Sequence, residues 1–491
     1  MGLRRLLTVS AASALAIATL PMSAAQSTES APVLDWVPCQ DSYLEAFTCA
    51  ILERPLDRAR PNGAKIQIAM VKLPASGTPE QRVGTLFMNP GGPGGSGVEA
   101  APYASAGLPN DVRESFDFVT WDPRGIGSST PAIKDCTAAM PQRPSTGPVD
   151  WQQVLRGRVR YLGSVNRRCY AQNASLINHV GTVDGAYDLD AMRAAVGDER
   201  LTYWGISYGT MLGSTYAQLF PENVRALVLD GNMDPQIGLL RLSWGASATD
   251  NSIGYYFEVF PELEPKFIAV REYLNERAIT IPGGTPYTRW DLLDTVAGHV
   301  AAVDGWPTAR DAIESSYDAI FATGETQAAA LAALQGARFR SPSTDSNAGV
   351  FSAILCQDFA GRPGRAQQRS TMDTAVLEGP LYGGVLAADF LAACSGYGRI
   401  KASPVPRPTA YGPNVPGLVV NSTRDAETPY QWAVNMARTY PSMRMVTSPS
   451  GLHGTFGLAQ DACINDTVSD FLLSGVVPAL DVVCPFTPPR D

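Results

Sequence analysis

Residues 201–209 contain a serine whose neighbours suit nucleophilic catalysis. An apolar and aromatic run, Leu201 to Ile206, leads into Gly205-Ile206-Ser207-Tyr208-Gly209, and a helical stretch rich in small residues follows. This G-x-S-x-G arrangement is typical of a nucleophile elbow, a strained turn between a buried strand and a helix. The flanking glycines let neighbouring backbone pass where a Cβ would clash. The pattern predicts Ser207 as a nucleophile, placed at a helix N-terminus that favours a developing oxyanion.

A serine hydroxyl needs a general base, and the chain contains only three histidines. In hydrolases with this elbow, the acid and then the histidine follow the serine along the chain. His179 precedes the serine, and His299 lies in an apolar helical stretch where a packing role is expected. His453 follows the last predicted strand, in a loop that could present its imidazole. We therefore predict His453 as the base.

The carboxylate that orients the histidine is predicted to be Asp425, which lies just past a strand end and before His453. Two acidic residues are rivals for this role. Glu427 fits the opening of a helix before Pro429, because acids are favoured near helix N-termini. Asp230 ends an earlier strand, where it is expected to brace its loop.

A glycine-rich loop, Asn89 to Gly97 (NPGGPGGSG), directly follows the apolar run Thr85 to Met88. It could be an ordinary flexible loop, and a phosphate-binding loop is disfavoured because no G-K-[ST] ending is present. Its place after a buried strand and upstream of the elbow matches the loop that supplies backbone N–H groups to an oxyanion. We predict this second role.

Short apolar strands alternate with helices along most of the chain, which is typical of a mostly parallel, doubly wound sheet. Strands are predicted at 65–73, 85–88, 116–121, 201–206, 224–229, 415–420 and 443–446, and a helix is predicted at about 428–440. After the strand at 116–121, Arg124 is expected to anchor an ion pair rather than to act in catalysis.

Residues 232–405 break this alternation, with helical patterns at 255–273, 289–303, 326–334 and 348–359. A large, mainly helical cap is expected there, because caps exclude water and select substrates. The predicted organisation is a first core part at 35–231, the cap at 232–405, and a C-terminal core part at 406–491.

Residues 1–25 have the features of an export signal peptide. Arg4 and Arg5 precede a short apolar stretch, and Ser23-Ala24-Ala25 offers small residues for cleavage. The arginine pair leaves both the general secretory and the twin-arginine route open. We expect a secreted protein, periplasmic or extracellular, without stable membrane insertion.

The composition, 45% hydrophobic and 17% charged, indicates a globular protein with a large core. Cleavage of the signal would remove two arginines and no acidic residue, taking the formal net charge from −9 to −11. Such an acidic chain lacks the excess of basic residues expected of a protein that binds nucleic acid. We expect a monomer.

The eight cysteines indicate disulfide bonds, which fits export. A metal site is disfavoured, since no C-x-x-C occurs and histidine is scarce, and we expect neither a metal nor another cofactor. Eight cysteines allow 105 connectivities, of which pairing between neighbours is the simplest. The expected bonds are Cys39–Cys49, Cys136–Cys169, Cys356–Cys394 and Cys463–Cys484.

Seven motifs occur in a familiar order: NPGGPGGSG, WDPRGIGSS, YDLDAMRAAVG, WGISYGTMLG, VRALVLDGNMDP, RDAETP and LHG. With them the chain resembles the exported tripeptidyl-aminopeptidase and proline-iminopeptidase-like branch of the α/β-hydrolases. The likeness covers most of 35–230 and 350–491. The resemblance implies an α/β-hydrolase fold with a catalytic triad of Ser207, Asp425 and His453.

The resemblance also implies that the oxyanion donors are the backbone N–H groups of Tyr208, Gly91 and Gly92. One departure concerns the loop before the histidine, where this chain has Leu452 and the family usually has glycine.

The functional expectation is a serine exopeptidase that cleaves peptides near a free N-terminus through an acyl-enzyme. Such an enzyme needs a carboxylate for the substrate amine. Asp358 is our candidate, with Glu258 and Glu262 behind it. The triad alone does not separate this reading from an esterase or amidase acting on small or lipid-like acyl substrates. A non-catalytic secreted binding protein on a hydrolase scaffold is the alternative of another class.

Overall fold

The computed structural model describes residues 34–134, 136, 143–284, 286–336, 348–359, 361–408, 411–459 and 461–489. The predicted signal peptide lies outside them. A ten-stranded sheet runs through the molecule in the order β1-β2-β3-β5-β4-β6-β7-β10-β11-β12. Its strands are β1 (Val37–Pro38), β2 (Thr48–Pro55), β3 (Lys65–Leu73), β4 (Gly84–Asn89), β5 (Phe116–Trp121), β6 (Leu201–Ile206), β7 (Val224–Asp230), β10 (Gly417–Ser422), β11 (Arg444–Ser448) and β12 (Val482–Val483).

From β5 to β12 the sheet is parallel, whereas β1, β2 and β3 pair antiparallel at one edge. The predicted strands at 65–73, 116–121 and 201–206 have the observed bounds, and the other four differ by one or two residues at one or both ends. The segment from 35 to 49, which the Cys39–Cys49 bond closes, contributes β1 and the start of β2 to the sheet. The mostly parallel, doubly wound sheet is confirmed.

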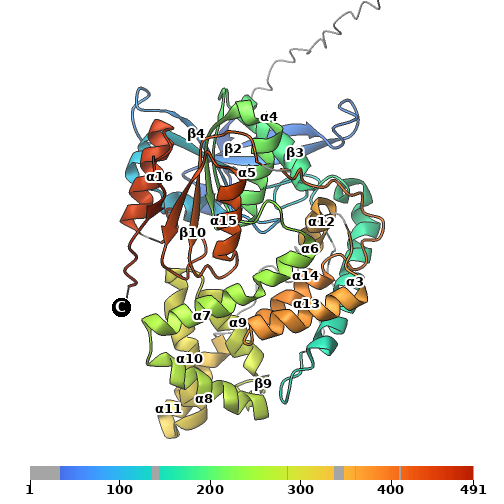
Figure 1. Ribbon diagram of the computed structural model, residues 1–491, viewed down its shortest axis with the longest axis vertical. Coiled ribbons are helices and arrows are strands. Elements are labelled where there is room, and N and C mark those ends of the chain that lie inside the picture. The colour runs from blue at the N-terminus through green and yellow to red at the C-terminus, as the bar shows by residue number, and fades with distance from the viewer. Residues whose placement is uncertain are drawn as a thin grey trace, which may run out of the picture.

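Helices cover both faces of the sheet (Figure 1). One face packs against α4 (Thr182–Ala195), α5 (Tyr208–Leu219) and α15 (Tyr430–Thr439). The other packs against α1 (Gly97–Ala106), α2 (Asn110–Ser115) and α16 (Ala462–Ser474). Side chains of the central strands alternate between these two cores, as Leu227 and Leu229 against Ala226 and Val228 show.

Between β7 and β10 the chain leaves the sheet and forms the helical cap in the lower half of Figure 1. The cap helices pack partly around an apolar core of their own and partly against the core of the sheet, and β8 (Ile279–Thr280) pairs with β9 (Pro286–Tyr287) beside them. They are α6 (Leu239–Leu242), α7 (Ser247–Val259), α8 (Leu263–Glu276), α9 (Arg289–His299), α10 (Trp306–Phe321), α11 (Gly324–Gly336), α12 (Ala348–Asp358), α13 (Arg365–Glu378) and α14 (Gly383–Ala392), with 3₁₀ turns at Ser243–Ala246 and Val303–Gly305.

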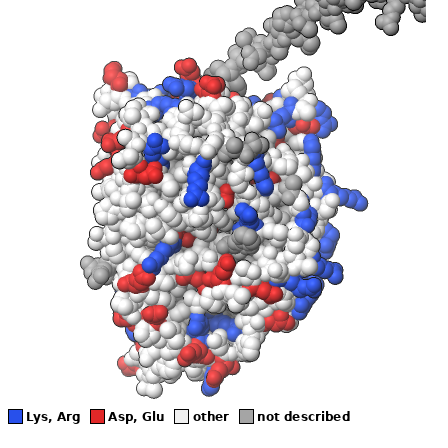
Figure 2. All heavy atoms as spheres, viewed as in Figure 1, with Lys and Arg blue, Asp and Glu red and all other residues white. Residues whose placement is uncertain are grey.

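One further helix, α3 (Trp151–Ile177), joins the cap from an earlier part of the chain. It packs against α12, α13 and α14. It contains several arginines and no acidic residue, and basic side chains gather on the right-hand edge of Figure 2, where Figure 1 places α3. The cap is therefore built from two segments of the chain, α3 and the helices between β7 and β10. The sequence patterns indicated only the second segment.

Four disulfide bonds join the cysteines in the neighbour pairing expected from the sequence. Two of them involve cap helices: Cys136–Cys169 joins α3 to the segment that precedes it, and Cys356–Cys394 joins α12 to the residues just after α14. No helix among the described residues combines the length and apolarity needed to cross a bilayer.

Arg124, after β5, is buried in an ion pair with Asp188 of α4, as predicted. Both side chains are at most 3% exposed. The guanidinium also donates to the carbonyl oxygens of Pro55 (3.1 Å) and Leu56 (2.9 Å), so it ties β2, β5 and α4 together.

Removing the carboxylate would leave this guanidinium buried without a counter-charge. We expect Asp188→Asn to lower the free energy of unfolding by about 3–5 kcal/mol, measured by urea denaturation. The matched control is Asp57→Asn, whose partner Arg60 is 77% exposed; a much smaller loss is expected there, because exposed ion pairs contribute little to stability. Equal losses in the two variants would contradict the assignment.

Candidate active site

Ser207 occupies the sharp turn between β6 and α5. Its backbone has φ 57° and ψ −122°, and it is the only non-glycine residue with positive φ among those the structure describes. A Cβ on Gly205 would lie 2.4 Å from the carbonyl oxygen of Gly209. The two glycines of the motif therefore touch each other, which lets the strand and helix meet at this angle.

The glycine-rich loop passes directly over this turn. A Cβ on Gly91 (φ 97°) would lie 2.9 Å from the Cβ of Ser207 and 3.3 Å from the backbone nitrogen of Tyr208. Gly91 donates its own N–H to Asn89 Oδ1 (3.1 Å). Within the described residues, no hydrogen bond uses the N–H groups of Gly92 or Tyr208. Of the three expected oxyanion donors, these two remain free to bind a ligand oxygen.

Asp425 and His453 meet at the same edge of the sheet. Asp425 Oδ1 lies 2.8 Å from His453 Nδ1, and it also accepts the N–H groups of Glu427 (2.9 Å) and Thr428 (2.8 Å). The Asp425 side chain is fully buried and that of His453 is 10% exposed. This carboxylate is thus held in place from three directions while it orients the imidazole.

Strand register explains why residues so distant in sequence come together. Ile206 of β6 is paired with Asp230 of β7, and Asp230 with Val420 of β10. Ser207, Gly231 and Asn421 follow these three positions at the carboxyl ends of parallel strands. A Cβ on Gly231 would lie 3.0 Å from the His453 ring, so the imidazole stands directly over the end of β7.

Asp230 braces the histidine loop, whereas the sequence predicts a bracing role in the loop after its own strand. Its Oδ2 accepts the N–H groups of Thr455 (2.7 Å) and Phe456 (2.9 Å), two and three residues after His453. Burial raises the pKa of this carboxyl to about 6, and the two backbone donors oppose the shift.

Comparisons with known proteins identify the family of this chain. Residues 84–267 match the family model "alpha/beta hydrolase fold", and residues 379–484 match the model "TAP-like protein". Serine protease Hip1 of Mycobacterium tuberculosis is 30% identical over 492 residues, covering 92% of this chain and 91% of the relative. The chain belongs to the tripeptidyl-aminopeptidase-like α/β-hydrolases.

Two other relatives have different names. A tripeptidyl aminopeptidase of Streptomyces coelicolor is 29% identical over 484 residues, covering 93% of this chain and 87% of the relative. A carboxylesterase B of Mycobacterium tuberculosis is 29% identical over 506 residues, covering 92% and 90%. The family relation identifies a hydrolase, and the choice between peptide and ester substrates needs further argument.

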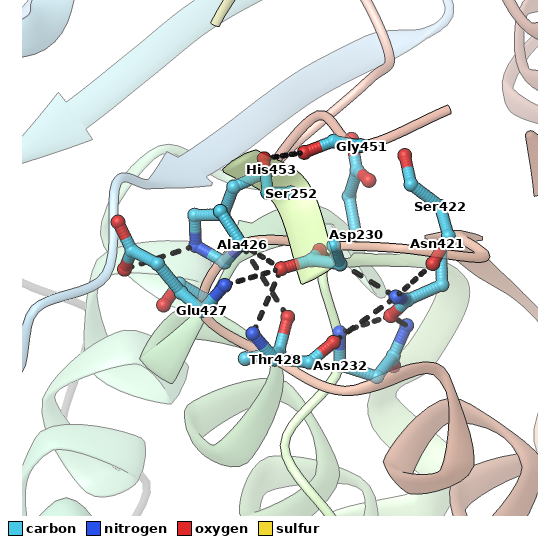
Figure 3. Close-up of polar contacts among 12 residues, drawn as sticks. Asp230, Asn232, Ser252, Asn421, Ser422, Ala426, Glu427, Thr428, Gly451 and His453 are labelled. Carbon is cyan, nitrogen blue, oxygen red and sulfur yellow. Dashed lines mark hydrogen bonds and ion pairs between the residues drawn. The ribbon is translucent and has the colours of Figure 1, made fainter. Parts of the chain in front are cut away.

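Glu427 does not lie in the first turn of a helix, where the sequence predicted it. Helix α15 begins only at Tyr430, and the Glu427 carboxylate lies 3.5 Å from His453 Nε2. Figure 3 shows it beside the imidazole. Burial lowers the pKa of His453, but the carboxylates of Asp425 and Glu427 outweigh this effect and raise it to about 10.

Thr428 was not recognised from the sequence. Its hydroxyl lies 3.4 Å from His453 Nδ1, in addition to its backbone contact with Asp425. Its position three residues after Asp425 could have pointed to it, because Asp side chains commonly accept backbone N–H groups from the residues that follow in the chain.

The other two histidines lie away from this site. The His299 ring nitrogen Nδ1 is 2.8 Å from the Thr295 carbonyl oxygen within α9. His179 lines a separate polar cavity of about 330 Å³ together with Asp57, Asp184 and Lys401.

Leu452, the departure from the family pattern, connects the histidine loop to the cap. It is 1% exposed and belongs to the apolar core of the cap. On either side of it, the Ser252 hydroxyl donates to the Gly451 carbonyl oxygen (2.8 Å) and His453 N–H donates to the Ala301 carbonyl oxygen (2.8 Å). The histidine is thus held from the cap as well as from the sheet.

The expected amine-binding role of Asp358 does not fit its position. The side chain is 1% exposed, and its two oxygens accept Thr182 N–H (2.8 Å) and Oγ1–H (2.6 Å) at the start of α4. Thr182 Oγ1 also contacts the Tyr208 hydroxyl. The runners-up Glu258 and Glu262 form exposed ion pairs, with Arg424 and Arg310 respectively.

Burial raises the pKa of Asp358 to about 7, against the hydrogen bonds from Thr182. Between about pH 4 and pH 7 the folded state therefore binds more protons than the unfolded state, so this contribution to stability is present below pH 4 and lost as the pH rises through 7. Asp358→Asn lacks this titrating group. As the pH rises from 4 to 7, we expect its free energy of unfolding to increase relative to that of the wild type by at least about 1.4 kcal/mol, the equivalent of one pKa unit.

The measurement is urea denaturation of both proteins at several pH values from 4 to 8. Titrating groups common to both proteins cancel in the difference, and solvent-exposed Asp466→Asn is the control for loss of a carboxylate as such. A difference that stays constant with pH would contradict the inference.

Proposed function

We propose that the protein is an exported serine peptidase that cleaves peptides near a free N-terminus through an acyl-enzyme. The observation that carries the chemistry is the buried Asp425–His453 contact of 2.8 Å at the sheet edge where the strained Ser207 turn ends. The peptide substrate rests on the relatives named as a tripeptidyl aminopeptidase and a serine protease.

In this mechanism Ser207 Oγ attacks the scissile carbonyl carbon, and His453 Nε2 takes its proton and passes it to the leaving amine. Asp425 fixes the tautomer that carries the proton on Nδ1. The backbone N–H groups of Tyr208 and Gly92 stabilise the developing oxyanion, aided by the N-terminus of α5. Water then attacks the acyl-enzyme by the same route and releases the peptide fragment.

Export is supported by the predicted signal peptide and by four disulfide bonds, which persist in oxidising compartments. A carboxylesterase activity is the second candidate, and it rests on the relative of that name.

Substitutions in the proposed triad test the chemistry. Ser207→Ala removes the nucleophile and is expected to abolish hydrolysis, and Asp425→Asn is expected to lower kcat about 10⁴-fold through the wrong histidine tautomer. Turnover is measured with peptide anilides, and circular dichroism checks folding. Substantial turnover by folded Ser207→Ala would refute the assignment.

The choice of substrate is tested with matched pairs of anilides of one to three residues, each with a free and an N-acetylated amine. A peptidase that requires the free N-terminus is expected to lose at least about tenfold in kcat/KM on acetylation, because a site built for a polar group rejects substrates that leave that site unpaired. Equal cleavage of both forms, or faster cleavage of simple p-nitrophenyl esters at matched acyl groups, would favour the esterase.

A further inference from the structure

We propose that Glu427 competes with Ser207 for His453 Nε2, so that the base becomes available only when the Glu427 side chain turns away from the imidazole. The inference rests on the proposed function of His453 as the base. It gives Glu427 a positioning role: it does not act on substrate but controls when the base is free.

The two carboxylates beside the imidazole are held very differently. Asp425 is fully buried and its Oδ1 accepts two backbone N–H groups besides facing Nδ1. Glu427 is 60% exposed, and within the described residues its carboxylate has one polar partner, His453 Nε2 at 3.5 Å. Asp425 is thus fixed, whereas Glu427 can swing into solvent at the small cost of an exposed ion pair.

The chemistry at Nε2 makes this contact inhibitory. To take the serine proton, Nε2 must present a lone pair to Ser207 Oγ. A carboxylate can only accept, so its contact with Nε2 is favourable when that nitrogen carries a proton and points it at Glu427. Within the described residues no hydrogen bond joins Ser207 Oγ to His453, which fits an imidazole engaged elsewhere.

The surroundings reinforce the protonated form of the ring. The charged groups that face it are Asp425 and Glu427 from the loop before α15 and Asp230 from the end of β7. The cap meets His453 with the uncharged backbone of Ala301. Glu427 is the exposed member of this acidic set, so removing its charge is the least disruptive way to free the base.

Labelling of Ser207 by a fluorophosphonate tests the proposal without any peptide substrate, since the probe needs only an activated serine. Glu427→Gln and Glu427→Ala are expected to label about two- to fivefold faster than wild type at pH 6, the range an exposed ion pair can account for. The rates should converge only above about pH 10, the raised pKa of His453 in the wild type, where the base becomes free in all three proteins. The acid limb of the pH–rate profile should move to lower pH by the logarithm of this fold-change.

Glu262→Gln is the matched control, because Glu262 is a 54% exposed carboxylate paired with Arg310 in the cap. Its profile should overlie that of the wild type, and Ser207→Ala should not label. Overlying profiles for wild type and both Glu427 variants would overturn the proposal. Slower labelling of those variants at every pH would also overturn it, because Glu427 would then support the base. Absence of labelling in the wild type itself would instead refute the proposed nucleophile.

Discussion

The active-site edge depends on Asp230, which links the nucleophile turn to the histidine loop. Its carbonyl oxygen accepts Ser207 N–H (2.9 Å), and its carboxylate accepts the N–H groups of Thr455 and Phe456. One residue at the end of β7 thereby sets the positions of both proposed reacting groups. Burying this carboxylate is unfavourable, as its raised pKa shows, and two backbone donors compensate for part of that cost. A buried acid next to a catalytic centre can thus serve geometry alone.

The histidine loop is also the place where the cap meets the core. Leu452 packs among cap side chains, and His453 N–H donates to the Ala301 carbonyl oxygen. A change in the position of the cap would therefore shift the backbone that carries the imidazole. Leu452 supplies an apolar side chain to this contact, which a glycine at that position would lack. The proposed base is therefore held by the cap as well as by the sheet.

The sequence predicted the parallel core well because its strands are short and apolar, as at 116–121 and 201–206. It missed β2 and α3 for a physical reason. In β2 (TCAILERP) buried and exposed positions mix with charges, and α3 carries many arginines, so neither stands out by hydrophobicity. Histidine scarcity and chain order pointed to His453, and spacing pointed to Asp425. The place of Asp358 could not be predicted, because it depends on how α12 packs against α4.

Glu427 shows the same limit at the scale of one side chain. Its neighbours in sequence, Asp425 and Pro429, suggest a role at a helix start, but its carboxylate faces a histidine from another loop. Three acidic residues surround one imidazole, and burial separates their functions. Asp425 is buried and aligned with Nδ1, so it orients the ring; Asp230 is buried and aligned with backbone N–H groups, so it holds the loop. Glu427 is exposed, and among the described residues its carboxylate has one polar partner, which is the condition for the movement that we propose. Local sequence can identify the acids, but only their solvation distinguishes a fixed support from a mobile competitor.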